Sequence, residues 1–166
     1  MPNATSLIRT GFGFDSHLFS DRGTLVLGGH MFPGTPALKG HSDGDALLHA
    51  VIDSILGAAV LGDIGDMFPD SSKKLKGISS VKLLQQALKK VLASGWAPAH
   101  IDVTVLADKP RLTPVKSKLR AGLAKNLKLP IHAVSLKAKT QEGLAWFHQP
   151  GGIAVWSVAT LTRVEI

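Results

Sequence analysis

The last strand-like segment of the chain restricts the fold more than any other feature of the sequence. Residues 153–164 read IAVWSVATLTRV, a long run that is apolar on both faces of an extended chain. A strand of this kind must be covered on both sides. If helices of the same chain cover one side, a second subunit is the natural cover for the other. The sequence therefore predicts a homo-oligomer.

The remaining segments alternate between strand and helix patterns. The sequence predicts strands over residues 7–14, 24–27, 101–107 and 133–138, and helices over 45–61, over 81–93 and after Thr113–Pro114. This order indicates an α/β (α+β) fold, in which a mixed β-sheet is covered by helices on one face. Because no repeat or linker interrupts the chain, we expect a single domain over residues 1–166.

The charge of the chain is unevenly distributed. Residues 1–70 carry eight acidic and three basic side chains, whereas residues 71–166 carry four acidic and sixteen basic ones. A uniformly basic nucleic-acid binder would not concentrate its acids in one half. An acidic, histidine-rich half beside a basic half is typical of a metal site paired with a polyanionic small substrate. Because the chain has no cysteine, any metal must be held by His, Asp and Glu.

Neither a secretory signal nor a membrane span is predicted. The first residues, MPNATSLIRT, lack a charged region followed by a long apolar run. No stretch approaches the roughly 20 apolar residues that a spanning helix needs. We expect a soluble cytoplasmic protein without a membrane partner.

The first candidate site is a metal centre. In an extended chain Asp15 and His17 point to the same side, and His49 could supply a third ligand, which would leave one open position on a zinc ion. Asp45 and Asp53 lie four residues either side of His49, and one of them could bind its other ring nitrogen. By itself, however, an Asp-x-His pattern is more often structural.

Three further segments are candidates for a functional role, each with an ordinary alternative. Residues 41–45 read HSDGD at a predicted helix start, capped by Ser42 and Asp45, where free amides favour a phosphate. The acidic loop 62–70 begins at Gly62, which should end the helix. Residues 137–142, KAKTQE, suit a hard metal ion that bridges phosphate oxygens. The alternatives are an N-cap, a solvated loop and a solvated strand end.

Together these segments resemble the 2-C-methyl-D-erythritol 2,4-cyclodiphosphate synthase family of the non-mevalonate isoprenoid pathway. Residues 11–17, GFGFDSH, are similar to the family's G-x-G-[FY]-D-x-H, and residues 41–49, HSDGDALLH, match its H-S-D-[GA]-D-x-x-x-H. Residues 137–142 resemble its K-A-[TK]-T-x-E. Matches at LGAAVLGDIG, FPD, KG and the region from Asp102 to Pro110 extend the similarity over nearly the whole chain.

The resemblance implies a homotrimer with active sites between adjacent subunits. The substrate would be 4-diphosphocytidyl-2-C-methyl-D-erythritol 2-phosphate. Its 2-phosphate would attack the β-phosphorus of its own diphosphate, which gives the cyclic diphosphate and releases CMP. The enzyme would be a phosphorus–oxygen lyase.

The resemblance also implies roles for individual residues. Asp15, His17 and His49 would bind zinc, and Glu142 would bind magnesium or manganese. His41 and Ser42 would hold a phosphate, and Asp63 would accept hydrogen bonds from the erythritol hydroxyls. The remaining substrate contacts would come from Ile64, Gly65, Phe68, Pro69, Asp70, Lys76, Ala107, Pro110, Arg111, Leu112, Thr113, Ala138, Lys139 and Thr140.

The chain departs from the family pattern after Glu142. The family usually reads L-G-[FY]-x-G-R-G-E-G-I there, whereas residues 144–153 read LAWFHQPGGI. Gln149 replaces an arginine that faces the central cavity of the trimer, and Gly151 replaces a glutamate. Because the arginine is a bidentate phosphate partner, we expect that an isoprenoid diphosphate is not retained in this cavity.

Three other functions fit parts of the sequence. A zinc- or magnesium-dependent phosphohydrolase would use the same ligands on water and would not release a cyclic product. A basic nucleic-acid-binding module would use the positively charged half, and its binding would survive loss of His17. An inactive family member would explain the altered tail, but the intact Asp15, His17, His49 and Glu142 favour an active enzyme.

Overall fold

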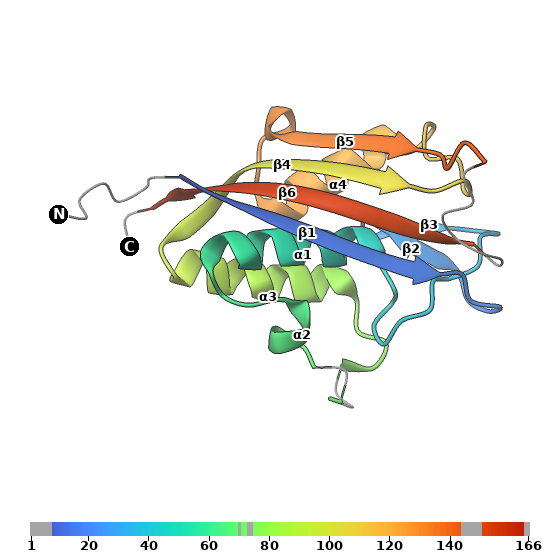
Figure 1. Cartoon of the computed structure of the whole chain (residues 1–166), viewed down its shortest axis with the longest axis horizontal. Coiled ribbons are helices and arrows are strands. Elements are labelled where there is room, and N and C mark those ends of the chain that lie inside the picture. The colour runs from blue at the N-terminus through green and yellow to red at the C-terminus, as the bar shows by residue number, and fades with distance from the viewer. Residues whose placement is uncertain (1–7, 70, 73–74, 144–150, 165–166) are drawn as a thin grey trace.

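A four-stranded mixed sheet organises the chain (Figure 1). The computed structural model describes residues 8–69, 71–72, 75–143 and 151–164. The strands lie in the order β1-β6-β4-β5, where β6 is antiparallel to β1 and β4, and β4 is parallel to β5. Their bounds are β1 (Ile8–Leu18), β4 (Trp96–Leu106), β5 (Val134–Lys139) and β6 (Gly152–Arg163). A separate hairpin consists of β2 (Leu25–Leu27) and β3 (His30–Phe32).

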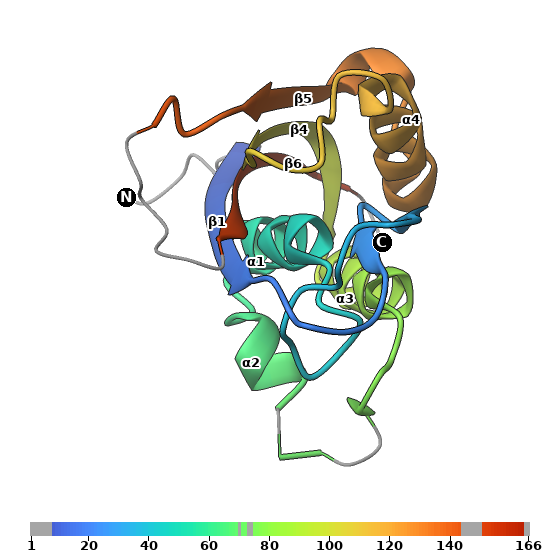
Figure 2. The same cartoon turned by 90° about the vertical axis from the view of Figure 1, so that its right-hand side faces the viewer.

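The helices lie on one face of this sheet. Figure 2 shows the sheet arching over α1, with α3 beside α1 and α4 next to β5. The bounds are α1 (Ala46–Ala59), α2 (Ile64–Met67), α3 (Ser80–Ala93) and α4 (Lys116–Leu127), with a 3₁₀ turn at Ile131–Ala133. Buried apolar side chains of α1, such as Leu48 and Ile52, pack with Val155 of β6 in one core. The predicted mixed sheet with helices on one face is confirmed.

Strand β1 approaches α1 unusually closely, because two of its inward-facing residues are glycines. A Cβ atom added to Gly13 would lie 2.0 Å from the carbonyl oxygen of Ala50. One added to Gly11 would lie 2.2 Å from that of Ser54. The backbone of β1 therefore rests directly on the backbone of α1. This contact sets the position of Asp15 and His17, the next inward-facing residues of β1, relative to the helix.

Strands β1 and β4 are longer than the sequence pattern predicts. The prediction that the first strand ends at Phe14 is wrong, because β1 continues pairing with β6 as far as Leu18. Asp15 and His17 therefore lie within a strand, opposite Val155 and Ile153. Strand β4 begins five residues before the predicted start, and β3 was not predicted.

The predicted ends of the helices are also wrong in places. Asp45, not Ser42, is the N-cap of α1, since its carboxylate accepts a hydrogen bond from the amide of Leu48. Helix α1 ends at Val60, which adopts a left-handed conformation (φ 60°), before Gly62 is reached. The short α2 was not predicted.

The starts of α2 and α4 also differ from the sequence prediction. Asp63 and Asp66 form a capping box that starts α2 within the predicted acidic loop. Thr113 does not cap α4. A turn intervenes, and the helix begins at Lys116.

Among the described residues, apolar side chains are exposed on the face of the sheet opposite α1. Phe12 and Phe14 of β1 are 63% and 45% exposed there, and Val158 of β6 is 37% exposed. The ring of Phe14 lies 5.5 Å from that of Trp156. Exposed apolar side chains on adjacent strands are typical of a surface that another protein covers. No helix in the described part of the chain is both long and apolar enough to cross a membrane.

Candidate metal centre and active site

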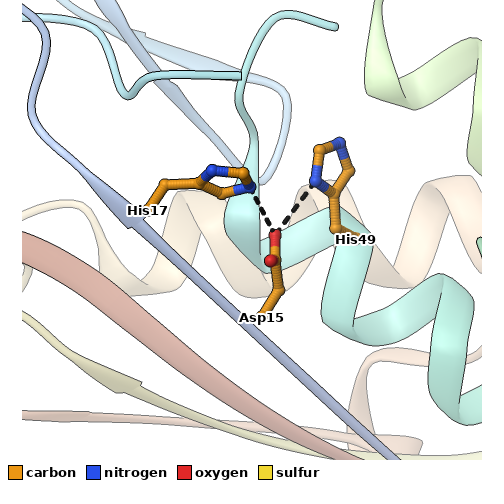
Figure 3. Close-up of side chains that lie close together, drawn as sticks. All are labelled: Asp15, His17 and His49. Carbon is orange, nitrogen blue, oxygen red and sulfur yellow. Dashed lines mark hydrogen bonds and ion pairs between the residues drawn. The ribbon is translucent and has the colours of Figure 1, made fainter. Parts of the chain in front are cut away.

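Asp15 and His17 of β1 and His49 of α1 converge on one point (Figure 3). Oδ2 of Asp15 lies 2.9 Å from Nε2 of His17 and 3.0 Å from Nδ1 of His49. The candidate ligand atoms all lie within 4.8 Å of one another. Asp15 and His17 share a face of β1 because they are two residues apart. His49 reaches them because the glycines of β1 bring α1 close.

The carboxylate between the two imidazoles is held in its charged form. Burial raises the pKa of Asp15, but the hydrogen bonds and charges of His17 and His49 lower it by more. The pKa therefore falls from its ordinary value of 3.8 to about 2. One carboxylate and two imidazoles are a donor set that fits a divalent cation, with a coordination position left for a substrate. Among the described residues, no other three His, Asp or Glu side chains form such a group.

The second ring nitrogen of His49 does not contact an aspartate. Its Nε2 lies 3.0 Å from Oγ of Ser42 and 2.9 Å from Oγ of Ser80. The prediction that Asp45 or Asp53 would bind this nitrogen is therefore wrong.

The two aspartates bind backbone amides instead. Asp45 is fully buried and accepts hydrogen bonds from the amides of Gly28 and Gly29, at 2.8 and 2.6 Å. Asp53 accepts one from the amide of Ile64 at 2.8 Å. Burial raises the pKa of both carboxyl groups, and these amide donors oppose that effect. Asp45 thus ties the β2–β3 hairpin to the start of α1, and Asp53 ties α2 to the middle of α1.

The three candidate ligands open into a pocket of about 560 Å³. The predicted site residues that line it with them are His41, Ser42, Ile64, Gly65 and Phe68. The predicted helix start at residue 45 is one residue too early, and Asp45 rather than Ser42 is the N-cap, so His41 and Ser42 lie in the loop before α1. Lining residues that the sequence did not single out are Lys39, Gly40, Ser72, Leu75, Ile78 and Leu83. Lys39 and Gly40 directly precede the HSDGD motif, which is a signal that could have indicated them.

Of the predicted substrate contacts close to α2 in the sequence, Asp63, Pro69 and Lys76 are not part of this lining. Asp63 uses Oδ1 to accept a hydrogen bond from the amide of Asp66 at the start of α2. Pro69 and Lys76 are exposed nearby in the sequence. Asp70 lies outside the described residues, as do Trp146 and Gln149 of the altered tail.

Glu142 belongs to a different pocket of the same chain. This pocket of about 330 Å³ is lined by Thr104, Leu106, Lys139, Thr140, Gln141, Glu142 and Trp156. The hydroxyl of Thr140 donates a hydrogen bond to the carboxylate of Glu142. Within one chain, the structure therefore separates Glu142 and Thr140 from Asp15, His17 and His49.

The segment after β4 lies against the segment after β5. The amide of Ala107 donates to the carbonyl oxygen of Lys139 at 2.9 Å. The carboxylate of Asp108 accepts from the amide of Gln141 at 2.8 Å and from its Nε2 at 2.7 Å. The sequence did not indicate this pair, which ties two predicted substrate-binding segments together.

Of the other predicted contacts, Arg111 and Thr113 are exposed. Pro110 and Ala138 are half-buried, and Leu112 is buried.

Comparison with known proteins gives a consistent result. The model of the YgbB family matches residues 8–162. The chain is 42% identical over 158 residues to the 2-C-methyl-D-erythritol 2,4-cyclodiphosphate synthase of Gemmatimonas aurantiaca, with 95% of each chain covered. It is 45% identical over 157 residues to the synthase of Bordetella petrii, which covers 95% of this chain and 97% of that one. It also matches the bifunctional enzyme IspD/IspF of Campylobacter concisus at 47% identity, over 91% of this chain and 41% of that one.

Solved structures share the fold. The bifunctional IspDF from Campylobacter jejuni superposes with a TM-score of 0.89 at 40% identity, covering 95% of this chain and 43% of that one. A 2C-methyl-D-erythritol-2,4-cyclodiphosphate synthase in a CDP-bound form gives 0.84 at 35% identity, over 92% and 99% of the two chains. The CDP complex of IspF from Plasmodium falciparum gives 0.81 at 27% identity, over 98% and 100%.

Proposed function

The chain belongs to the YgbB family, and we propose that the pocket around Asp15, His17 and His49 is where it carries out the family's reaction. That reaction converts 4-diphosphocytidyl-2-C-methyl-D-erythritol 2-phosphate into 2-C-methyl-D-erythritol 2,4-cyclodiphosphate and CMP. It is a lyase step of isoprenoid biosynthesis by the non-mevalonate pathway. The observation that carries this placement is the convergence of one carboxylate and two imidazoles at the wall of a substrate-sized pocket.

Asp15, His17 and His49 would hold a zinc ion. Two imidazole nitrogens and one carboxylate oxygen are zinc ligands, and three protein ligands leave a fourth position for the substrate. A cation bound there supplies Lewis-acid polarisation of the β-phosphoryl group and neutralises charge that collects during the reaction.

The other residues of the pocket would position the substrate. The attacking phosphate is already anionic at neutral pH, so no strong general base is required. The difficulty is to bring several negative charges together in one geometry. Lys39, His41 and Ser42 line the pocket and carry the N–H and O–H donors that a phosphate needs. Oδ1 of Asp63 is used in the cap of α2, so we assign Oδ2 to the erythritol hydroxyls.

The second pocket would bind the cytidine diphosphate part of the substrate. Glu142, with the hydroxyl of Thr140 beside it, would bind magnesium or manganese on the phosphates. The segment over residues 107–113, tied to Gln141 through Asp108, would enclose the nucleotide. The CDP complexes of similar synthases support a nucleotide-diphosphate site in this fold.

A homotrimer would bring the two pockets together. They are separate within one chain, and the face of the sheet opposite α1 carries exposed Phe12 and Phe14. If that face packs against other subunits, the Glu142 pocket of one subunit can lie beside the Asp15 pocket of its neighbour. We therefore propose composite active sites between adjacent subunits, and a small-molecule substrate rather than a nucleic acid. The cytoplasmic location stays a prediction.

Phosphorus NMR of the products tests this function. The purified protein is incubated with the cytidine-diphospho substrate, zinc and magnesium, with and without EDTA. The proposal predicts metal-dependent formation of CMP and a cyclic diphosphate in equal amounts. Release of inorganic phosphate without a cyclic product would instead identify a phosphohydrolase. No reaction by a zinc-loaded protein would contradict the assignment.

A further inference from the structure

The hydrogen bonds of His49 lead to a buried serine that no sequence motif singled out. Ser80, the first residue of α3, is fully buried. Its hydroxyl donates to Oδ1 of Asp43 at 2.5 Å and lies 2.9 Å from Nε2 of His49. The backbone amide of Ser80 donates to Oδ2 of Asp43 at 3.0 Å. The carboxylate of Asp43 thus holds Ser80 with both oxygens, and Ser80 in turn contacts the candidate metal ligand.

The donors and acceptors along these hydrogen bonds determine which ring nitrogen of His49 carries the proton. A serine hydroxyl has one proton, and an ionised carboxylate can only accept. Because the proton of Ser80 is directed to Asp43, its oxygen can only accept from His49. Nε2 of His49 must therefore carry a proton. The opposite tautomer would leave two lone pairs facing each other across 2.9 Å.

Ser42 fits the same assignment. Its Oγ lies 3.0 Å from Nε2 of His49, so it can share the N–H proton with Ser80. With the proton on Nε2, the lone pair of a neutral ring lies on Nδ1. Nδ1 is the atom that faces Asp15 at 3.0 Å. A lone pair that faces a carboxylate is favourable only when a cation lies between them, which is what a bound metal ion provides.

We propose that Asp43 and Ser80 are positioning residues that hold the proton of His49 on Nε2 and thereby present Nδ1 to the metal ion. This rests on the metal-binding role proposed for His49. Hydrogen-bond partners of this kind orient a ligating imidazole, and their loss typically costs about 10- to 100-fold in metal affinity. Neither residue lines the pocket or belongs to the candidate ligand group, so their effect passes through the ring of His49.

The zinc affinities of four variants, measured by competition with a chromophoric chelator, test the proposal. Ser80→Ala and Asp43→Ala should each weaken zinc binding by about 10- to 100-fold. Two controls should leave it unchanged. Ser79→Ala removes the neighbouring hydroxyl, which makes no capping hydrogen bond. Ser54→Ala removes a fully buried serine of α1 that is bonded to Ser157 rather than to His49, so it reports any general effect of losing a buried hydroxyl.

A second measurement needs no variant. Nitrogen-15 NMR of histidine-labelled wild-type protein reads which ring nitrogen is protonated in the zinc-loaded state. The proposal predicts that Nε2 of His49 carries the proton and that Nδ1 carries none. A proton on Nδ1 with none on Nε2 would overturn it, as would equal zinc affinities of Ser80→Ala and wild type. Absence of zinc binding by the wild type would overturn the metal centre as well, whereas the other two results would overturn only the role of Asp43 and Ser80.

Discussion

Replacing Gly13 by alanine should separate β1 from α1 and destroy the metal centre. The added Cβ would lie 2.0 Å from the carbonyl oxygen of Ala50 and 2.6 Å from the amide nitrogen of Ser54. Both are backbone atoms of α1, so neither can rotate away. Ordinary contact at this position needs about 3.5 Å, so the strand and the helix must part by more than about 1 Å.

Two measurable effects follow from this displacement. Overpacking of a tight contact lowers the free energy of unfolding by about 1–3 kcal/mol. Metal ligands tolerate errors of only about 0.2 Å, and Asp15 lies two residues beyond Gly13 on the same face of β1. Gly13→Ala should therefore unfold at lower urea concentration and lose most of its zinc affinity. Tryptophan fluorescence during urea unfolding and chelator competition measure the two effects.

Gly57→Ala is the matched control. Gly57 lies on α1, and its added Cβ would meet nothing nearer than the carbonyl oxygen of Phe12 at 4.0 Å. Alanine within a helix is more stable than glycine by about 0.5–1 kcal/mol, so this variant should be at least as stable as wild type and should bind zinc normally. Wild-type zinc affinity in Gly13→Ala would refute the close contact between β1 and α1 as the basis of the site.

Other changes have separate expected results. His49→Ala should lose zinc and nearly all CMP release while subunit assembly is kept, as metal analysis, turnover and light scattering would show; turnover at the wild-type rate would contradict the ligand role. Glu142→Gln should shift the magnesium dependence of CMP release more than the zinc content, and an unchanged magnesium titration would count against its role. In the metal-free protein, the folded-state pKa of Asp15 is about 2 and its ordinary value is 3.8, so its charge stabilises the fold by about 2 kcal/mol above pH 3.8. This contribution should disappear as the pH falls towards 2. Asp15→Asn should lack that pH dependence in urea unfolding. The same pH profile in Asp15→Asn and wild type would refute this contribution of Asp15. Asp108→Ala should weaken CDP binding, measured by calorimetry, with zinc content unchanged, because it removes the carboxylate that binds the backbone amide and Nε2 of Gln141; unchanged CDP affinity would remove this pair from the nucleotide site.

The candidate ligands could be predicted because their signals are local or tied to a long motif. Asp15 and His17 share a face through strand periodicity alone, and His49 follows HSDGD at a fixed distance on a helix. Asp45 shows where such reasoning fails. A spacing of four residues brings side chains together only when both residues are helical, and Asp45 has φ −73° and ψ 84°. Its carboxylate turns to the amides of Gly28 and Gly29 instead.

The contacts that the sequence could not predict are long-range. Ser80 reaches His49 across 31 residues through the packing of α3 against α1, and a single serine carries no pattern that indicates this. The same holds for Asp108 and Gln141, which are 33 residues apart. Strand β1 continues past its apolar pattern because β6 pairs with it along its whole length. Pairing partners, and not local hydrophobicity, set these limits.

Anomalous scattering at the zinc edge from crystals of the zinc-loaded protein tests the central claim most directly. The account predicts one peak in each chain, at about 2.0–2.2 Å from a carboxylate oxygen of Asp15, Nε2 of His17 and Nδ1 of His49. A peak held by other side chains would contradict it. So would the absence of a peak at these residues in crystals of an enzyme whose CMP release depends on zinc.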